Sequence, residues 1–465
     1  MTARKKTGSA KAAPKNRTEI SPARKAAFNV LLAVERGHSH SDDLLRGKAV
    51  NALSPADRNL ATALVLGVLR WQIRLDHQLY ALLSRPNAKL DAEIRIALRL
   101  GAFQILYMDR IPARAAIDES VELAKQAGHR FASGMVNAVL RKLGAAPQLQ
   151  LPEENAAEVA LAQAHPAWMV ERWAQFYGME AARAICCHGQ SQPALTVRLA
   201  TPAVEAELVA AGIHLEAGDL LTAARIVVSG DVTEFLKGRV RLQDEGSQLV
   251  AELACGCRDE KVKSILDCCA APGGKTMILA ERNPTARIVA MESSAPRLEQ
   301  LRKRLAHLGD GVECRLADAT ALTEEAAYDL ALADVPCSGT GTLGRNPEIR
   351  HRLRVDDLAR QSERQRAILT AAVRAVRPGG RVVYSTCSLE PEENEQVVAV
   401  VLAATPKARL VSLEASIDEV LREGILADKG AERLRGALTP EGFLRLLPGR
   451  FHADGFFVAL IERIA

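Results

Sequence analysis

The sequence predicts a multidomain protein with an all-α N-terminal domain, a small α/β domain and a C-terminal α/β domain with a mostly parallel sheet. Three observations support this fold class. The chain has 465 residues, which is too long for one ordinary hydrophobic core. Residues 22–143 repeat apolar side chains at helical spacing, without a run that alternates like a strand. From residue 247 onward, strand-like and helical runs alternate, which is typical of βαβ units.

The N-terminal part divides into a basic arm and a helical domain. Residues 1–20 are basic and poor in large apolar side chains, so we expect a disordered arm that is either a solvated tail or a phosphate tether. The helical domain is expected over residues 21–144. Its first helix should end at Gly37, and its second should begin with Ser54 as N-cap and Pro55 in the first turn.

Two further boundaries follow. Residues 145–163 are polar and contain prolines, which predicts a linker, and residues 164–245 contain helical and strand-like runs, which predict a small α/β domain. The last domain is expected over residues 246–465. Its strand-like runs are KSILDCC, ARIVAMES, VECRLAD, YDLALADVP, GRVVYSTC and GFFVALIER.

Composition excludes several classes of protein. No apolar run approaches the ~20 residues of a membrane helix, and the N-terminus has no apolar core of a secretory signal. Nine cysteines, an odd number without a Cys-x-x-Cys pair, indicate reduced thiols, a cytoplasmic location and no metal site. The net charge of +5 permits a polyanionic partner without requiring one.

The glycine-rich segment LDCCAAPGGKT raises the question of a nucleotide-triphosphate loop. That motif requires glycine at the position of Cys269, and Pro272 removes an N–H from the middle of the phosphate cradle. Asp267, at the end of the strand-like run, would also direct a carboxylate toward the phosphates. The sequence therefore predicts that this loop holds a ligand without a polyphosphate.

Acidic residues follow three later strand-like runs: Glu292 in AMES, Asp318 in LADAT and Asp334 in LADVP. The carboxyl ends of parallel strands form the edge of the sheet where ligands bind. Carboxylates there suit ribose hydroxyls, an exocyclic amine and a sulfonium charge. S-adenosylmethionine carries all three and no phosphate. Glu292 is expected at the ribose, Asp318 at the adenine edge, and the loop 270–275 around the methionine part.

Two cysteines also follow strand-like runs, Cys337 in DVPCSGTG and Cys387 in YSTCSLEPEENE. A free cysteine is most often a buried apolar residue, but both of these lie in polar, turn-forming contexts. A thiolate beside a methyl donor suits methylation of cytosine at carbon 5. That carbon becomes nucleophilic once the thiolate adds to carbon 6, and Asp334 is placed to act as an acid at N3.

These motifs resemble the NOL1/NOP2/Sun family of RNA cytosine-5 methyltransferases, from LQDEGSQLVA at Leu242 to DGFFVAL near the C-terminus. The helical domain is similar to the RNA-binding factor NusB, most closely in PARAAIDESVELAKQAGHRFASGMVNAVLRKL. The resemblance implies a NusB-like RNA-binding domain before a Rossmann-like methyltransferase domain. It also implies a bacterial enzyme that methylates a cytosine of 16S rRNA.

The resemblance further implies roles for individual residues. Cys387 would be the nucleophile, Cys337 would assist release of the methylated RNA, and Asp334 would complete the catalytic group. The implied cofactor is S-adenosyl-L-methionine. Its binding residues would be Cys269, Ala270, Ala271, Pro272, Gly273, Gly274, Lys275, Glu292, Asp318 and Asp334. The expected partner is 16S rRNA before full assembly of the 30S subunit, with no membrane or DNA partner and no partner subunit.

Two other function classes remain possible at this point. A cysteine hydrolase would pair Cys337 or Cys387 with a histidine, and an RNA-binding protein without activity would have no need of either cysteine. The candidate histidines for a hydrolase are His188, His351 and His452. For RNA binding, basic residues near the catalytic cleft are expected to add to the helical domain; these are Arg345, Arg350 and Arg352.

Overall fold

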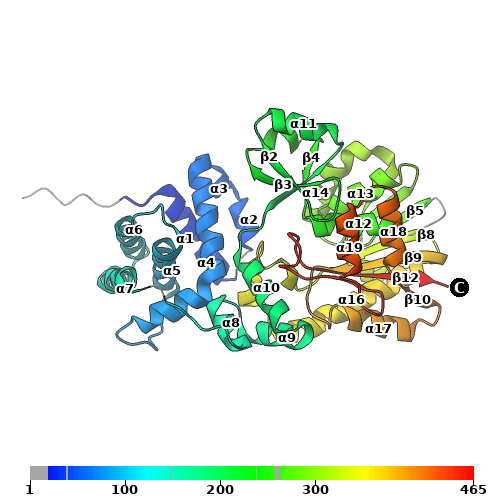
Figure 1. Cartoon of the computed structure of the whole chain (residues 1–465). Coiled ribbons are helices and arrows are strands. Elements are labelled where there is room, and N and C mark those ends of the chain that lie inside the picture. Colours follow the sequence, from blue (N-terminus) through cyan, green and yellow to red (C-terminus); the bar gives the residue numbers. More distant parts are fainter. Residues whose placement is uncertain (1–18, 38–39, 148, 237, 257–261, 465) are drawn as a thin grey trace, which may run out of the picture. The chain divides into compact units, whose positions relative to one another are not determined.

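The computed structural model describes residues 19–37, 40–147, 149–236, 238–256 and 262–464 (Figure 1). The chain forms two compact units, residues 1–150 and 151–465. The basic arm expected over residues 1–20 lies outside the described residues except for Glu19 and Ile20. In the described part of the chain, no helix is long and apolar enough to cross a membrane.

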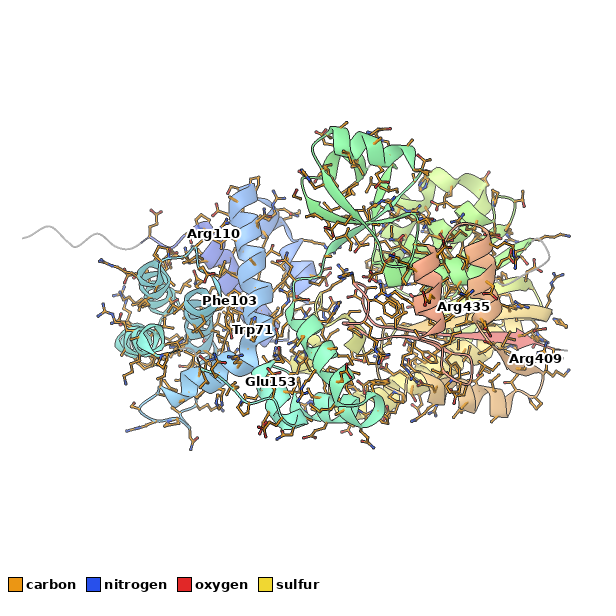
Figure 2. The ribbon with its side chains drawn as sticks, viewed as in Figure 1. Trp71, Phe103, Arg110, Glu153, Arg409 and Arg435 are labelled. Atoms are coloured by element: carbon orange, nitrogen blue, oxygen red, sulfur yellow. The ribbon has the colours of Figure 1, made fainter. Side chains whose placement is uncertain are left out.

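The first unit is helical, which confirms the all-α prediction. Side chains of α4 and α5 pack closely because Gly67 leaves room for the Phe103 ring, which a Cβ at position 67 would meet at 2.0 Å. Trp71 stacks on Tyr107, with ring centroids 4.5 Å apart, and Figure 2 labels Trp71 and Phe103 on these two helices. The helices are α1 (Pro22–Glu35), α2 (Ser41–Leu45), α3 (Lys48–Asn51), α4 (Pro55–Ala81), α5 (Ala92–Tyr107), α6 (Ala113–Gln126) and α7 (Ser133–Ala145), with a 3₁₀ turn over Arg130–Ala132.

The second unit begins with three helices: α8 (Ala156–Ala162), α9 (Ala167–Tyr177) and α10 (Met179–Gln190). The first of them occupies part of the segment expected as a linker over residues 145–163. The side chain of Asn155 caps this helix by accepting a hydrogen bond from the Glu158 N–H at 3.0 Å. Val159 is buried in a cluster that includes Trp173, and this packing stabilises a helix too short to be recognised by its periodicity.

A small antiparallel sheet follows, with strand order β2-β3-β1-β4. Its elements are β1 (Leu195–Leu199), α11 (Ala203–Ala210), β2 (His214–Ala217), β3 (Ala224–Ser229) and β4 (Val240–Leu242). Three of these strands, β1, β3 and β4, coincide with the strand-like runs of this segment, which are ALTVRLA, ARIVVSG and RVRLQD. The fourth, β2, has four mostly exposed residues, and its sequence HLEA carries no clear strand pattern.

The large sheet has the order β10-β12-β9-β8-β5-β6-β7, with β11 paired to β12. The pairs from β9 across to β7 are parallel, and β12 is antiparallel to its neighbours, which confirms a mostly parallel sheet. The strands are β5 (Ser264–Asp267), β6 (Arg287–Glu292), β7 (Val312–Leu316), β8 (Tyr328–Asp334), β9 (Val376–Thr386), β10 (Ala408–Val411), β11 (Leu444–Leu446) and β12 (Phe456–Arg463).

Helices cover both faces of this sheet (Figure 1). On one face lie α12, α18 and α19, and on the other lie α16 and α17, each against a buried apolar cluster. The chain moves from β5 outward to β6 and β7, then returns to β8 on the other side. This reversal of strand order creates the point where open α/β sheets bind ligands. The helices are α12 (Glu245–Cys255), α13 (Gly274–Arg282), α14 (Ala295–Leu305), α15 (Ile349–Arg352), α16 (Val355–Ala375), α17 (Glu395–Ala404), α18 (Glu414–Arg422) and α19 (Asp428–Arg435).

Candidate active site

The loop between β5 and α13 is tied to the neighbouring strands by its backbone. The N–H of Cys268 donates to Leu332 O at 2.9 Å, and the N–H of Ala270 donates to Met291 O at 2.8 Å. Gly273 has φ +98°, and a Cβ there would also lie 2.9 Å from a methyl carbon of Leu301. Both its left-handed backbone and this close approach require glycine.

Asp267, at the end of β5, supports the loop from inside the protein. Its carboxyl accepts a hydrogen bond from the Thr276 hydroxyl at 2.7 Å, and burial raises its pKa to about 6. This contact ties the end of β5 to the first turn of α13. The acid therefore has a structural role in holding the loop.

A cavity of about 300 Å³ opens at the carboxyl edge of the parallel strands. Glu292 ends β6, Asp318 follows β7, and Asp334 ends β8, and all three acids line this cavity. Of the predicted loop residues, Cys269 and Ala271 line it as well. The remaining predicted loop residues are not among those that line the cavity: Ala270, Pro272, Gly273, Gly274 and Lys275.

Each of the three acids is held by hydrogen bonds. Glu292 accepts from the Ser294 N–H at 2.8 Å and lies 3.4 Å from the Arg297 guanidinium. The backbone N–H of Thr320 donates to Asp318 at 2.9 Å and lowers the pKa of that carboxyl.

Asp334, the third acid, is paired with a lysine and a serine hydroxyl. Its two oxygens accept from Lys275 Nζ and from the Ser385 hydroxyl, each at 2.7 Å. Burial alone would lower the pKa of Lys275, but the Asp334 carboxylate outweighs burial and raises that pKa. The pair therefore places a lysine ammonium, held charged, directly against an acid that lines the cavity.

The two predicted cysteines meet at the cavity. Cys337 follows β8, Cys387 follows β9, and their sulfur atoms are 3.2 Å apart. The contact with Cys387, together with burial, raises the pKa of Cys337 well above its usual range. The raised pKa favours the protonated form of Cys337, whose S–H can donate a hydrogen bond to the sulfur of Cys387.

A buried carboxylate joins the two cysteine loops, and we call its contacts the Glu393 clamp. Glu393 is fully buried and accepts hydrogen bonds from the Ser338 N–H at 2.9 Å and from the Gln365 amide at 3.0 Å. The hydroxyls of Ser338 and Ser388 donate to its other oxygen. Each of these serines directly follows one of the cysteines, so the clamp fixes both sulfur atoms.

Sequence reasoning missed this clamp. Glu393 lies in the acidic run EPEENE, which has the composition of a solvated loop. The only available signal was a serine after each cysteine, in PCSG and TCSL. A buried partner for both hydroxyls could not be inferred from that pattern.

Replacing Glu393 with Ala is expected to lower the free energy of unfolding by about 3 kcal/mol, because several buried donors lose a charged acceptor. Glu393→Gln should cost less, since the serine hydroxyls can rotate to accept from the amide. Urea denaturation of the full chain measures both. Glu392→Ala is the matched control, because this neighbour is partly exposed and pairs with Arg172 at 2.6 Å. Equal losses for Glu392→Ala and Glu393→Ala would contradict the clamp.

The structure corrects one predicted RNA contact. Arg350 is only 2% exposed and donates to the backbone oxygens of Ala164 at 3.1 Å and Gly189 at 3.0 Å. Its expected role at the RNA surface is wrong, because the guanidinium is used inside the protein to join α10 and α15. Arg345 is paired with Asp244 at 3.0 Å and Asp454 at 2.7 Å, and its role, like that of Arg352, stays a prediction.

The geometry weakens the hydrolase alternative. None of the described residues that line the cavity is a histidine, so His188, His351 and His452 are not among the residues that share it with the two sulfurs. A cysteine hydrolase needs a base within hydrogen-bond reach of its nucleophile. Within the described residues there is also no group of three or more histidine, cysteine or acidic residues that could hold a metal ion.

Three family models match the chain. The model described as "16S rRNA methyltransferase RsmB/F" matches residues 256–462, and that described as "NusB family" matches residues 21–145. A third, described as "Methyltr_RsmF/B-like, ferredoxin-like domain", matches residues 165–231. The three matches follow one another along the chain.

Known proteins are similar over nearly the whole length. A probable ribosomal RNA small subunit methyltransferase B of Bacillus subtilis is 33% identical, covering 95% of this chain and 98% of that protein. The ribosomal RNA small subunit methyltransferase B of Vibrio cholerae is 31% identical, covering 94% and 96%. The solved structure of PH0851 has a TM-score of 0.75 at 23% identity, covers 96% of this chain and 100% of its own, and shows the same fold.

Proposed function

Because this chain belongs to the 16S rRNA methyltransferase RsmB/F family, we propose that it methylates carbon 5 of a cytosine in 16S rRNA, as methyltransferase B. One observation carries the proposal. The sulfurs of Cys337 and Cys387 lie 3.2 Å apart in a cavity that three carboxylates also line. Carboxylates suit a cationic cofactor, and paired thiols suit covalent attack on a pyrimidine.

The residues of the cavity fit S-adenosyl-L-methionine. Glu292 and Asp318 provide acceptors for hydroxyl and amine hydrogens, and Arg297, which also lines the cavity, can hold a carboxylate. Backbone groups of the loop from Cys269 to Lys275 complete this side of the site. When bound, the cofactor supplies an electrophilic methyl group.

Cys387 is the nucleophile in this mechanism. Its thiolate adds to carbon 6 of the cytosine, and the electron pair displaced toward carbon 5 makes that carbon nucleophilic. Lys275 lies close enough for its charge to interact with the Cys387 sulfur. A nearby ammonium favours the thiolate, and the S–H of Cys337 supports it further by a hydrogen bond.

Asp334 and Lys275 act on the opposite side of the base. Addition at carbon 6 places negative charge on the pyrimidine, and a proton at N3 neutralises it. The carboxyl of Asp334 contacts N3, and Lys275 Nζ, 2.7 Å away, passes a proton through this carboxyl to the base. Ser385 holds the second oxygen of Asp334 and so fixes the orientation of the carboxyl.

Cys337 assists the last step. Water takes up the proton from carbon 5, the proton at N3 returns to Lys275 through Asp334, and cleavage of the bond between carbon 6 and sulfur restores the aromatic base. The departing sulfur of Cys387 regains its electron pair while still in contact with Cys337. A hydrogen bond from the Cys337 thiol stabilises that leaving thiolate and frees the enzyme from its product.

The remaining parts of the proposal concern the substrate. Residues 21–144 bind RNA, residues 164–245 form a small domain beyond the linker, and residues 246–465 form the methyltransferase domain. The substrate is 16S rRNA before full assembly of the 30S subunit. The protein acts as a monomer in the cytoplasm, and its partners include no DNA and no membrane.

Bisulfite sequencing of 16S rRNA from a strain that lacks this protein tests the function. One cytosine that is protected in the parent strain should become convertible, and the purified protein with S-adenosyl-L-methionine should restore its protection. The control is the same strain supplied with Cys387→Ala. Unchanged protection at every cytosine of 16S rRNA would rule out this substrate.

A further inference from the structure

A second cavity, of about 840 Å³, lies between the small sheet and helices α13 and α14. We call it the α14 groove. Its charged and titratable lining consists of Arg198, Arg239, Arg241, Arg304, His307 and Glu281. Four arginines therefore face a single carboxylate, which gives this groove a positive charge unlike that of the acid-lined cofactor cavity.

The groove lies away from the reacting atoms. Helix α14 begins just after Glu292, at the carboxyl edge of the sheet, and its last turn precedes β7 at the opposite edge. Arg304 is in that last turn, and His307 follows it. The helix has 11 residues, so its two ends are separated by about 16 Å at 1.5 Å per residue. A ligand at Arg304 could not take part in the chemistry at Cys387.

Some of the groove's arginines already have acidic partners. Arg241 pairs with Glu281, at 3.0 Å for one contact, and Arg198 pairs with Glu252 at 2.7 Å. Arg239 forms an ion pair with Glu207. The pairs with Glu281 and Glu252 anchor the small sheet to α13 and α12, whereas Glu207 belongs to α11 of the small domain. Together the pairs leave part of the positive charge uncompensated.

Arg304 provides that uncompensated part, and His307 adds a ring N–H to the lining. In the part of the chain that the structure describes, the side chains of Arg304 and His307 form no ion pair and no hydrogen bond. Burial and the charge of Arg241 lower the pKa of Arg304, so these two guanidinium groups are close enough to repel each other. An anion bound between them would relieve that repulsion.

A buried side-chain N–H of Arg198 also indicates that the groove binds an anion. Arg198 lies opposite Arg241 on adjacent strands, and its side chain is only 5% exposed. Its Nη1 has no hydrogen-bond partner among the described residues. A buried guanidinium N–H without an acceptor is destabilising, and an oxygen of a ligand in the groove would satisfy it.

Apolar side chains distinguish this groove from a simple anion site. Leu242, which is 43% exposed, lines it together with Met277 and Leu308. In a nucleic-acid strand, the phosphates suit the arginines, and the sugars and bases suit the apolar side chains beside them. We propose that the α14 groove binds the backbone of the rRNA substrate at nucleotides remote from the reacting cytosine. This inference rests on the proposed function in taking rRNA as the ligand.

The test compares the double variant Arg304→Gln/His307→Gln with Lys303→Gln, a matched control on the exposed side of the same helix. Anisotropy with a labelled 16S rRNA transcript gives the Kd over a series of salt concentrations. The double variant should bind about tenfold more weakly, because it loses charged hydrogen bonds. Its salt slope should fall by about 0.7 for each phosphate contact removed. The KM for RNA should rise, while kcat at saturating RNA and the affinity for S-adenosyl-L-methionine stay unchanged.

Competitors identify the chemistry of the ligand. Poly(U) should displace the labelled transcript from the wild-type protein. The transcript that the double variant still binds should be displaced much less effectively. Polyglutamate of equal charge and inorganic phosphate should not reproduce this difference. If polyglutamate does, the groove is a site for an acidic protein segment, and if phosphate does, it is an anion site only; either result overturns the inference.

Failure of this inference and failure of the proposed function give different results. If the wild-type protein methylates 16S rRNA while the double variant matches it in Kd, salt slope and KM, the groove does not contact RNA. Equal weakening by Lys303→Gln would also reject the groove, since any surface charge would then suffice. If the wild-type protein neither binds nor methylates 16S rRNA, the proposed function itself is wrong.

Discussion

Cys387→Ala is expected to abolish methylation of RNA while leaving reversible RNA binding intact. Without the sulfur nucleophile, carbon 5 of the cytosine is never activated. Cys337→Ala should behave differently. The attack by Cys387 remains possible, but the departing thiolate loses its hydrogen-bond donor, so a covalent protein–RNA adduct should accumulate.

A denaturing gel with labelled RNA and S-adenosyl-L-methionine separates these two outcomes. Cys337→Ala should give a band that migrates above the free protein, and Cys387→Ala should give none. Cys186→Ala is the control, since this cysteine is buried in another cluster and should leave the turnover unchanged. An adduct with Cys387→Ala and none with Cys337→Ala would reverse the two roles. Full activity in both variants would exclude covalent catalysis.

Asp334→Asn is expected to lower kcat by a factor of about 10² to 10⁴, the usual contribution of a positioned acid or base. The amide keeps the shape of the carboxyl but cannot carry the proton from Lys275 to N3. The variant also removes the carboxylate that raises the pKa of Lys275, so that pKa should fall. Single-turnover kinetics with saturating RNA and cofactor measure the effect on the chemical step.

Asp318→Asn is the matched comparison for Asp334→Asn, because both acids line the cavity at neighbouring strand ends. Its expected effect is a higher KM for S-adenosyl-L-methionine with little change in kcat. The contrast separates cofactor binding from catalysis. A kcat for Asp334→Asn close to that of the wild-type protein would remove Asp334 from the catalytic group.

Much of the fold could be predicted because long elements carry regular patterns. Strands β5, β6, β8 and β9 are buried, apolar runs followed by turns, and they were found together with β7 and β12. The elements β2, β10 and β11 were missed. They have only three or four residues each, too few to show a period of two, and their pairing depends on longer strands far along the chain.

The residues of the candidate site could be predicted only where they stand at the ends of strands that the sequence pattern reveals. Each strand that ends at the cavity has an acid or a cysteine at its last position or just after it, and parallel strands bring such ends to one edge. Arg350 shows the opposite case, because an arginine in a basic run looks exposed until the carbonyls of Ala164 and Gly189 are placed beside it. Glu393 was overlooked for the same reason, since its partners come from other segments.

The Glu393 clamp also has a consequence for the lifetime of the folded protein. Ser338 and Glu393 are 55 residues apart, and their contact requires that β8 and β9 have already paired through the crossover of α16. Contacts between such distant segments form late in folding, after the cost of closing the loop has been met. Interactions absent from the folding transition state act mainly on the unfolding rate. We therefore expect the clamp to slow unfolding with little effect on how fast the chain folds, so that the two sulfur atoms stay in register for as long as the native domain persists.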